Sequence, residues 1–454
     1  MTPVRVAAAE VLLAVGRGRT TLAAAVDRAR SPLRDRRDRA LLVELATGVL
    51  RWRNALDAVI EAASRRPAAD IDDRALAVLR LGVYQLRHLT RVPAHAVLHE
   101  SVESVRALGA PRAASFVNAV LRTVTRGGRA LSLPERPADA GDRARWIEYL
   151  TVSLSHPSWL VERWLDRYGP AATEAWCTFN NRTPNVIVRP RPGLSSAALR
   201  DALAAHGIDA APARYVADAI TLAPGSLGRI EKADQERLHV QDEGSQLVAR
   251  AAGVRSGERV LDVCASPGGK TLVLATDLGA TGQAGHAALV AADYRPARVR
   301  LLADTLRAAG LAIPIVRLDA RTALPFTATF DAVLLDAPCS GLGTLSRDPD
   351  LKWSRTPDDL PALAGSQRRM VRAAAEVVAP GGRLVYATCS SEPEENIEVV
   401  DACLAGDDRF VLEPITSPAV PASLIDGRGC LRTLPFRDGL DAFFAAVLVR
   451  RKGT

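Results

Sequence analysis

The feature that most constrains the fold is a strand–loop–helix pattern that repeats from about residue 257 onward. Short apolar runs typical of buried strands, separated by helical stretches, occur at 259–263, 288–292, 313–317, 330–335 and 382–387. This alternation predicts a doubly wound parallel sheet, an α/β fold with helices on both faces. Ligands of such sheets bind at the carboxyl ends of the strands, so we expect the functional residues there.

A glycine-rich loop, CASPGGKT (264–271), directly follows the first of these runs. Glycine at such a turn lets the backbone approach a ligand closely. A nucleoside triphosphate would require GxxxxGK[ST], but Cys264 occupies the first glycine position, and the dinucleotide motif GxGxxG is absent. S-adenosylmethionine remains the candidate cofactor, because its loop need not cradle phosphates.

Acidic residues end the later strands. Asp293 ends the second, where a carboxylate can accept hydrogen bonds from both hydroxyls of a ribose. Asp319 ends the third, near the expected place of an adenine, and Asp336 ends the fourth. A single aspartate at a strand end is common as a helix N-cap. Three of them beside a glycine-rich loop favour a nucleoside ligand.

Two cysteines follow the fourth and fifth strands: Cys339 in DAPC (336–339) and Cys389 in YATCS (386–390). They either face one bound substrate or are two buried structural thiols, because free cysteine is among the most buried residue types. A thiolate that adds to C6 of a cytosine makes C5 reactive toward a methyl electrophile, and a second thiol can assist the final elimination. Asp336 and Lys270 are placed to stabilise charge on the ring.

The residues do not indicate zinc chemistry. A zinc deaminase needs H-x-E and P-C-x-x-C, but Leu342 replaces the second cysteine and none of the seven histidines has glutamate two positions later. The six cysteines form no CxxC pair, so no metal site is predicted. No apolar run approaches the roughly 18 residues of a membrane span, and no secretory signal is present. We therefore expect a cytoplasmic protein with free thiols.

The first 140 residues differ from the rest in periodicity and in charge. Apolar residues recur at helical spacing in several stretches between residues 4 and 108, which predicts an all-helical part. Residues 1–140 hold 23 Arg, no Lys and 14 Asp plus Glu, a net charge of +9, whereas the remainder carries −1. This imbalance indicates a polyanion partner such as RNA or DNA. A solvated, arginine-rich helical surface would give the same count.

We expect three domains in a chain of 454 residues. Residues 1–140 form the helical domain, which ends in a polar linker. Residues 141–240 form a small α+β domain, with a strand at 185–190 and a helix at 196–206. Residues 241–454 form the α/β domain.

Seven motifs resemble those of a known family. They are GVLR (48–51), LRLGVYQL (79–86), FVNAVLR (116–122), VQDEGSQ (240–246), CASPGGKT (264–271), DAPCSGLGT (336–344) and YATCS (386–390). The last four resemble the RNA cytosine-5 methyltransferases, most closely the bacterial RsmB type, also called Fmu or Sun. The first three resemble that family's helical domain, which is similar to the antitermination factor NusB. The resemblance covers nearly the whole chain.

The resemblance implies a NusB-like bundle, an RRM-like middle domain and a Rossmann-like methyltransferase domain that uses S-adenosylmethionine. It implies methylation at C5 of a cytosine in small-subunit (16S) ribosomal RNA by a monomer. Cys389 would be the nucleophile that adds to C6, and Cys339 would assist release. The implied cofactor contacts are Cys264, Ala265, Ser266, Pro267, Gly268, Gly269, Lys270, Asp293, Asp319 and Asp336.

Two alternatives stay open at this point. The chain could be an RNA-binding assembly or antitermination factor whose methyltransferase domain is vestigial. Its basic helical part favours that interpretation, whereas the intact loop, the three strand-end aspartates and both cysteines oppose it. The substrate could also be transfer RNA, because related enzymes share the catalytic core. The NusB-like helices favour ribosomal RNA by analogy.

Overall fold

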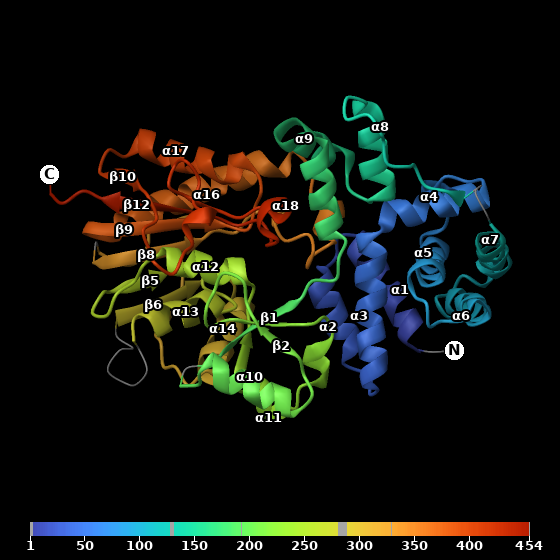
Figure 1. Cartoon of the computed structure of the whole chain (residues 1–454), viewed down its shortest axis with the longest axis horizontal. Helices are drawn as coiled ribbons and strands as arrows, with labels where there is room; N and C mark the ends of the chain where they lie inside the picture. The colour runs from blue at the N-terminus through green and yellow to red at the C-terminus, as the bar shows by residue number, and fades with distance from the viewer. Residues whose placement is uncertain (1–2, 128–130, 192, 280–287, 328, 454) are drawn as a thin grey trace. The chain divides into compact units, whose positions relative to one another are not determined.

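The computed structural model divides the chain into two compact units (Figure 1). The first comprises Met1–Thr183 and Leu345–Arg355, and the second comprises Pro184–Thr344 and Thr356–Thr454. The structure describes residues 3–127, 131–191, 193–279, 288–327 and 329–453. Within those ranges, no helix combines the length and the apolar character that a bilayer crossing requires.

The first unit is a bundle of helices, as the spacing of its apolar residues predicts. Its helices are α1 (Pro3–Gly16), α2 (Leu22–Arg30), α3 (Arg36–Arg51), α4 (Arg53–Ser64), α5 (Asp73–His88), α6 (Ala94–Ala107), α7 (Ala114–Arg126), α8 (Arg143–Glu148), α9 (Ser158–Asn180) and α15 (Leu351–Ser354). Asp35 and Asp72 cap α3 and α5, because their carboxylates accept hydrogen bonds from backbone N–H groups of the first turn. The predicted helical part is confirmed.

The core of this bundle forms where α3 and α5 approach each other closely. Leu42, Leu45 and Val49 fall on one face of α3, at spacings of three and four residues, and are at most 1% exposed. A Cβ atom on Gly48 would lie 2.1 Å from the ring of Tyr84 on α5. Glycine at position 48 therefore permits the close approach of the two helices.

The second unit begins with a small antiparallel sheet. Its elements are β1 (Val186–Pro190), α10 (Ser196–Ala205), β2 (Ala210–Pro212), β3 (Ile220–Leu222), α11 (Lys232–Gln235) and β4 (Leu238–Val240). The strand order is β2-β3-β1-β4. Leu199 and Leu203 of α10 pack with Val188 and Ile220 in a core of their own. The strand and the helix predicted for this part are both present.

A large sheet follows, in the order β10-β12-β9-β8-β5-β6-β7. Its strands are β5 (Val260–Asp262), β6 (Leu289–Asp293), β7 (Ile315–Arg317), β8 (Phe330–Asp336), β9 (Val378–Thr388), β10 (Phe410–Glu413), β11 (Leu431–Arg432) and β12 (Phe444–Arg450). The five strands that the sequence predicts, β5 to β9, pair in parallel. β12 pairs antiparallel with β9, and β10 and β11 with β12, so the complete sheet is mixed.

Helices cover both faces of this sheet (Figure 1). They are α12 (Glu243–Ala251), α13 (Gly269–Asp277), α14 (Pro296–Ala308), α16 (Asp359–Glu376), α17 (Ile397–Gly406) and α18 (Pro435–Asp438). Val260 and Leu334 pack toward Leu272 of α13 on one face. Leu261 and Val333 pack toward α16 on the other. Because both faces are buried, the strands are continuous apolar runs and do not alternate with polar residues.

β5 is the topological switch point of the sheet. The chain continues from β5 to β6 and β7 on one side, and then crosses to β8 and β9 on the other. Crevices at the carboxyl end of such a strand bind ligands in open α/β sheets. The compact units separate at 183/184, and the domain borders expected at 140/141 and 240/241 stay predictions.

Candidate active site

The glycine-rich loop joins β5 to α13 at the switch point. Gly268 has a φ of +112°, a backbone conformation that side chains disfavour, and a Cβ atom there would lie 3.1 Å from Leu302 and Thr305 of α14. A Cβ atom on Gly269 would lie 3.1 Å from the side chain of Gln241. Because Gly268 and Gly269 have no side chains, the loop can lie close to α14 and to Gln241.

A buried carboxyl group underlies this loop. Asp262, the last residue of β5, is fully buried and accepts a hydrogen bond from Thr271 Oγ1 at 2.7 Å. Burial raises the pKa of Asp262 to about 7, and outweighs the opposing effect of the Thr271 hydrogen bond. The negative charges of Asp336 and Asp293 add to the rise. Neither Asp262 nor Thr271 was among the predicted site residues.

The strand-end aspartates have different surroundings. Asp293 is 7% exposed, and its Oδ2 accepts a hydrogen bond from the backbone N–H of Ser266 at 3.2 Å. The end of β6 and the glycine-rich loop are thus in direct contact. Asp319 follows β7 and pairs with Arg321 at 2.7 Å, and this hydrogen bond lowers the pKa of Asp319. The exposed ring of Tyr294 lies under the Arg321 guanidinium, 5.3 Å away.

Lys270, at the start of α13, forms an ion pair with Asp336, the last residue of β8. Lys270 Nζ donates to Asp336 Oδ2 at 2.7 Å, with the side chains 13% and 27% exposed. Burial by itself lowers the pKa of Lys270, but the charge and hydrogen bond of Asp336, followed by Cys389, outweigh it and the net shift is upward. The lysine therefore stays cationic beside the two cysteines.

The two predicted cysteines meet. Cys339 Sγ and Cys389 Sγ are 3.3 Å apart, because β8 and β9 are neighbours and each thiol follows the carboxyl end of its strand. Both cysteines are free and partly exposed. The hydrogen bond with Cys389, burial, and then the charges of Cys389 and Glu395 raise the pKa of Cys339 well above its ordinary value. Two structural thiols would be expected to be buried, whereas Cys339 and Cys389 are both partly exposed.

The backbone around the cysteines is tightly packed. Gly343 N donates to Cys389 O at 3.0 Å, and Gly343 O accepts from Ala442 N at 2.9 Å. A Cβ atom on Gly343 would lie 2.0 Å from Ala442 O. The segment after Cys339 can therefore close over Cys389 only with glycine at this position.

Sequence reasoning missed a buried carboxylate behind the thiols. Glu395 is fully buried and accepts hydrogen bonds from Ser340 and Ser390, the residues that directly follow Cys339 and Cys389. The sequence shows only a glutamate in the polar run 392–396. No spacing rule marks it, because the contact depends on how two strand ends meet.

The loop region fits the nucleoside cofactor that the sequence indicates. Ser266 Oγ is buried and has no hydrogen-bond partner among the described residues, so it is a polar atom available to a ligand. The loop glycines leave the backbone open to close approach, and Asp293 lies directly against the loop. Within the described ranges, no group of three or more His, Cys, Asp or Glu side chains is arranged to hold a metal ion.

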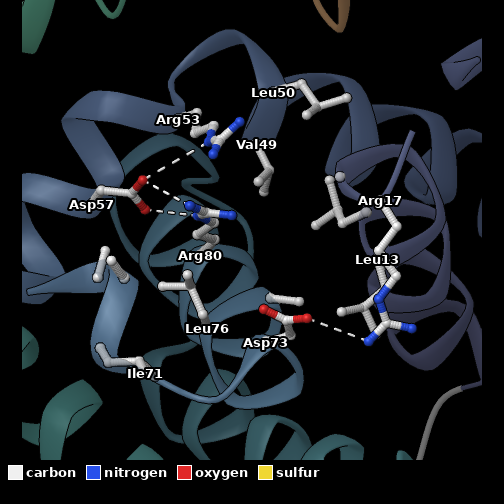
Figure 2. Close-up of a pocket in the computed structure, with 15 residues that line it drawn as sticks. Leu13, Arg17, Val49, Leu50, Arg53, Asp57, Ile71, Asp73, Leu76 and Arg80 are labelled. Carbon is white, nitrogen blue, oxygen red and sulfur yellow. Dashed lines mark hydrogen bonds and ion pairs between the residues drawn. The ribbon is translucent and has the colours of Figure 1, made fainter. Parts of the chain in front are cut away.

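The first unit contains a basic pocket of about 410 Å³ between α1, α3, α4 and α5 (Figure 2). Arg80 donates to both oxygens of Asp57 at 2.7 and 2.8 Å, and Arg53 lies 4.0 Å from the same carboxylate. Burial and then the neighbouring Arg80 lower the pKa of Arg53. Two guanidinium groups share one carboxylate, so this wall of the pocket carries excess positive charge.

The sheet, its switch-point loop and the strand-end acids together define the class of Rossmann-like methyltransferases. Family models agree along the chain: "NusB family" at residues 2–126, "RsmF/B-like, ferredoxin-like domain" at 156–226, and "16S rRNA methyltransferase RsmB/F" at 251–449. The expected NusB-like, RRM-like and methyltransferase folds are thereby confirmed.

Known proteins are similar over almost the whole length. The "probable ribosomal RNA small subunit methyltransferase B" of Bacillus subtilis is 35% identical, over 92% of this chain and 91% of that protein. The "ribosomal RNA small subunit methyltransferase B" of Pseudomonas putida is 38% identical, over 88% of each chain. The solved structure of PH0851 shares the fold, with 24% identity, a TM-score of 0.80 and 99% of both chains covered. The chain therefore belongs to the 16S rRNA methyltransferase RsmB/F family.

Proposed function

We propose that this protein methylates C5 of a cytosine in small-subunit ribosomal RNA, with S-adenosylmethionine as methyl donor. The observation that carries the proposal is the pair of thiols, 3.3 Å apart, at the ends of neighbouring strands. The relatives in Bacillus subtilis and Pseudomonas putida, named as small-subunit ribosomal RNA methyltransferases, support the substrate. The net charge of +9 on residues 1–140 and the basic pocket support a polyanion partner.

In this proposal Cys389 is the nucleophile. Its thiolate forms a bond to C6 of the cytosine, and the electron pair of the C5–C6 double bond moves into the ring, which makes C5 nucleophilic. The cationic Lys270 and its partner Asp336 lie beside the thiols and stabilise the charge that develops on the ring. After C5 is methylated, a base takes the C5 proton and the electron pair of that C–H bond restores the C5–C6 double bond. The S–C6 bond breaks in the same step, with its electron pair leaving on the sulfur of Cys389. Cys339 acts as acid or base in this release.

The cofactor would be held by the loop and the strand ends. The proposed contacts are Cys264, Ala265, Ser266, Pro267, Gly268, Gly269, Lys270, Asp293, Asp319 and Asp336. When bound, S-adenosylmethionine supplies an electrophilic methyl group. Asp293 positions the loop through Ser266 N and is the candidate partner of the ribose hydroxyls. Tyr294, which no sequence pattern indicated, adds an exposed aromatic face beside the Asp319–Arg321 pair.

Substitution of each cysteine tests the mechanism. Cys389→Ala is expected to reduce methyl transfer by at least about 10³-fold, because the nucleophile is lost. Cys339→Ala is expected to accumulate a covalent protein–RNA adduct, because addition proceeds and elimination fails. Both are measured with labelled S-adenosylmethionine and denaturing gels, with Cys403→Ala of α17 as control. Normal turnover by Cys389→Ala would contradict the proposed mechanism.

The substrate is tested by bisulfite sequencing of total RNA from cells with and without the protein. Loss of one protected cytosine in small-subunit ribosomal RNA is the expected result. Loss of a transfer RNA signal with ribosomal RNA unchanged would favour the transfer RNA alternative. No change in any RNA would favour an assembly factor with a vestigial methyltransferase domain.

The cytoplasmic location and the monomeric state that the sequence analysis expects for this protein remain predictions.

A further inference from the structure

Glu395 lies at the end of a short 3-10 turn (Pro393–Glu395) before α17 and is fully buried. Its Oε1 accepts hydrogen bonds from Ser340 N at 2.8 Å and from Gln367 Nε2 at 2.9 Å. Its Oε2 accepts from the hydroxyls of Ser340 and Ser390. The carboxylate thus receives four hydrogen bonds from three different parts of the second unit.

These contacts match the hydrogen-bonding capacity of an ionised carboxylate. Two oxygens offer about four lone-pair positions, and four donors occupy them. Each serine hydroxyl gives its single proton to Glu395. Each also lies within reach of a backbone N–H donor, that of Leu342 at 3.4 Å for Ser340 and that of Glu392 at 3.1 Å for Ser390. The hydrogen bonds replace the water that burial removes, so a charged group is sustained inside the protein.

The donors connect Glu395 to both segments that carry the thiols. Ser340 directly follows Cys339, and Ser390 directly follows Cys389, so one side chain restrains both segments. Gln367 Nε2 also donates to Pro338 O at 3.0 Å, on the other side of Cys339. The separation of 3.3 Å between the two sulfur atoms therefore depends on the carboxylate of Glu395, which is not a sequence neighbour of either cysteine.

The charges around the two thiols are unequal. The hydrogen bond with Cys389, burial and the charge of Cys389 disfavour the thiolate of Cys339, and the charge of Glu395 adds to them. Lys270, paired with Asp336, interacts with Cys389. The negative charge of Glu395 therefore adds to the effects that favour the protonated form of Cys339.

We propose that Glu395 is the positioning residue of the active site. It holds the segments after β8 and β9 so that the two thiols meet, and its charge favours the protonated form of Cys339. Glu395 itself touches no reacting atom. This inference deepens the proposed function and rests on it, because it explains why Cys389 and not Cys339 is the nucleophile.

The test compares Glu395→Gln with Glu398→Gln, an exposed glutamate three residues further on, as the matched control. Glu395→Gln keeps the size of the side chain but removes the charge and turns one acceptor into a donor. We expect kcat on a small-subunit ribosomal RNA transcript to fall by about 10- to 100-fold, because the thiols are misplaced. KM for the RNA should stay within about twofold of the wild type. The control should match the wild type in both constants.

A second readout needs neither RNA nor methyl transfer. Iodoacetamide alkylation of the two cysteines between pH 6 and 10, followed by peptide mass spectrometry, measures the thiolate on each sulfur. In the wild type and in Glu398→Gln, Cys389 should react faster than Cys339. In Glu395→Gln this preference should shrink by at least about threefold, because the charge that disfavours the Cys339 thiolate is gone.

The outcomes are distinguishable. A wild-type protein without methyl transfer would refute the proposed function, while the alkylation ratio still tests Glu395. Active wild-type protein together with an unchanged kcat and alkylation ratio in Glu395→Gln would refute only the role of Glu395. If Glu395→Gln fails to fold by circular dichroism, Ser390→Ala, which removes one of the four donors, replaces it. Ser390→Ala keeps the charge of Glu395 but loosens the segment after Cys389, so kcat should fall while the alkylation ratio stays close to that of the wild type. An unchanged kcat would then overturn the inference.

Discussion

Two aspartates of the second unit, Asp262 and Asp319, differ in burial and in hydrogen-bond partner. Asp262 is buried under the loop with a hydroxyl as its hydrogen-bond partner, whereas Asp319 lies near the surface beside a guanidinium. Burial therefore raises the pKa of Asp262 to about 7, while Arg321 lowers that of Asp319. Asp262 at the end of β5 and Asp319 after β7 therefore have pKa values shifted in opposite directions.

This difference predicts how stability depends on pH. The pKa of Asp262 is raised from 3.8 in the unfolded chain to about 7 in the folded one, so the folded state binds its proton more tightly. The stability it contributes is fully present below about pH 4 and is lost as the pH rises through about 7. Asp262→Asn cannot titrate, so its melting temperature relative to wild type should increase between pH 5 and 8. Thermal unfolding of both proteins measures this, and a constant difference over that range would contradict it.

At the scale of elements, the active site depends on how closely the ends of β8 and β9 can approach. The segment after Cys339 is hydrogen-bonded to Cys389 O and to Ala442 through both polar atoms of Gly343. These partners are backbone atoms of other elements, which cannot rotate away as a side chain can. The close approach of these backbone segments therefore leaves room only for the hydrogen atom of glycine at position 343.

Gly343→Ala is accordingly expected to misplace the segment that carries Cys339. Its Cβ would lie 2.0 Å from Ala442 O and 2.7 Å from Cys389 O, so the backbone must shift. We expect loss of methyl transfer by about 100-fold and a lower melting temperature. Gly365→Ala within α16 is the matched control, because a Cβ there meets nothing within 4 Å. It should raise stability by about 0.5–1 kcal/mol, since alanine is the better helix former. Equal behaviour of the two variants would contradict this account.

At the scale of the whole molecule, residues distant in the sequence share one compact unit. The chain leaves the second unit after Thr344, contributes Leu345–Arg355 to the first and returns at Thr356. Within the first unit, Lys352 is 1% exposed and its Nζ donates to Arg51 O, Ser155 O and Asn181 Oδ1 at 3.2, 3.3 and 2.8 Å. An ammonium group has three protons, and each of them has an acceptor.

Lys352→Met is therefore expected to destabilise the first unit. Burial lowers the pKa of Lys352, which shows that desolvation of its charge is costly, and methionine removes that cost. Three buried acceptors would lose their donor, however, at about 1–3 kcal/mol each. The second effect is larger, and we expect a net loss of about 2 kcal/mol or more. Differential scanning calorimetry measures it, with Lys452→Met at the exposed C-terminus as control. Unchanged unfolding would show that the three acceptors find other partners.

Features that depend on local pattern were predictable from the sequence. Helical spacing, continuous apolar runs and glycine placement are properties of neighbouring residues, so the helical bundle, strands β5 to β9 and the loop at 264–271 were predictable. Strand ends also located Cys339, Cys389, Asp293 and Asp336, since parallel strands bring their carboxyl ends to one edge of the sheet.

Which of these residues are in contact depends on the folded arrangement of the strands. The 3.3 Å between the thiols, the burial of Asp262 and the role of Gly343 depend on strand order and register, which local spacing does not encode. The burial of Glu395 and Lys352 could not be predicted from the sequence. Charged residues are expected at the surface unless a specific set of partners surrounds them. Their partners come from distant segments, and only folding brings those segments together.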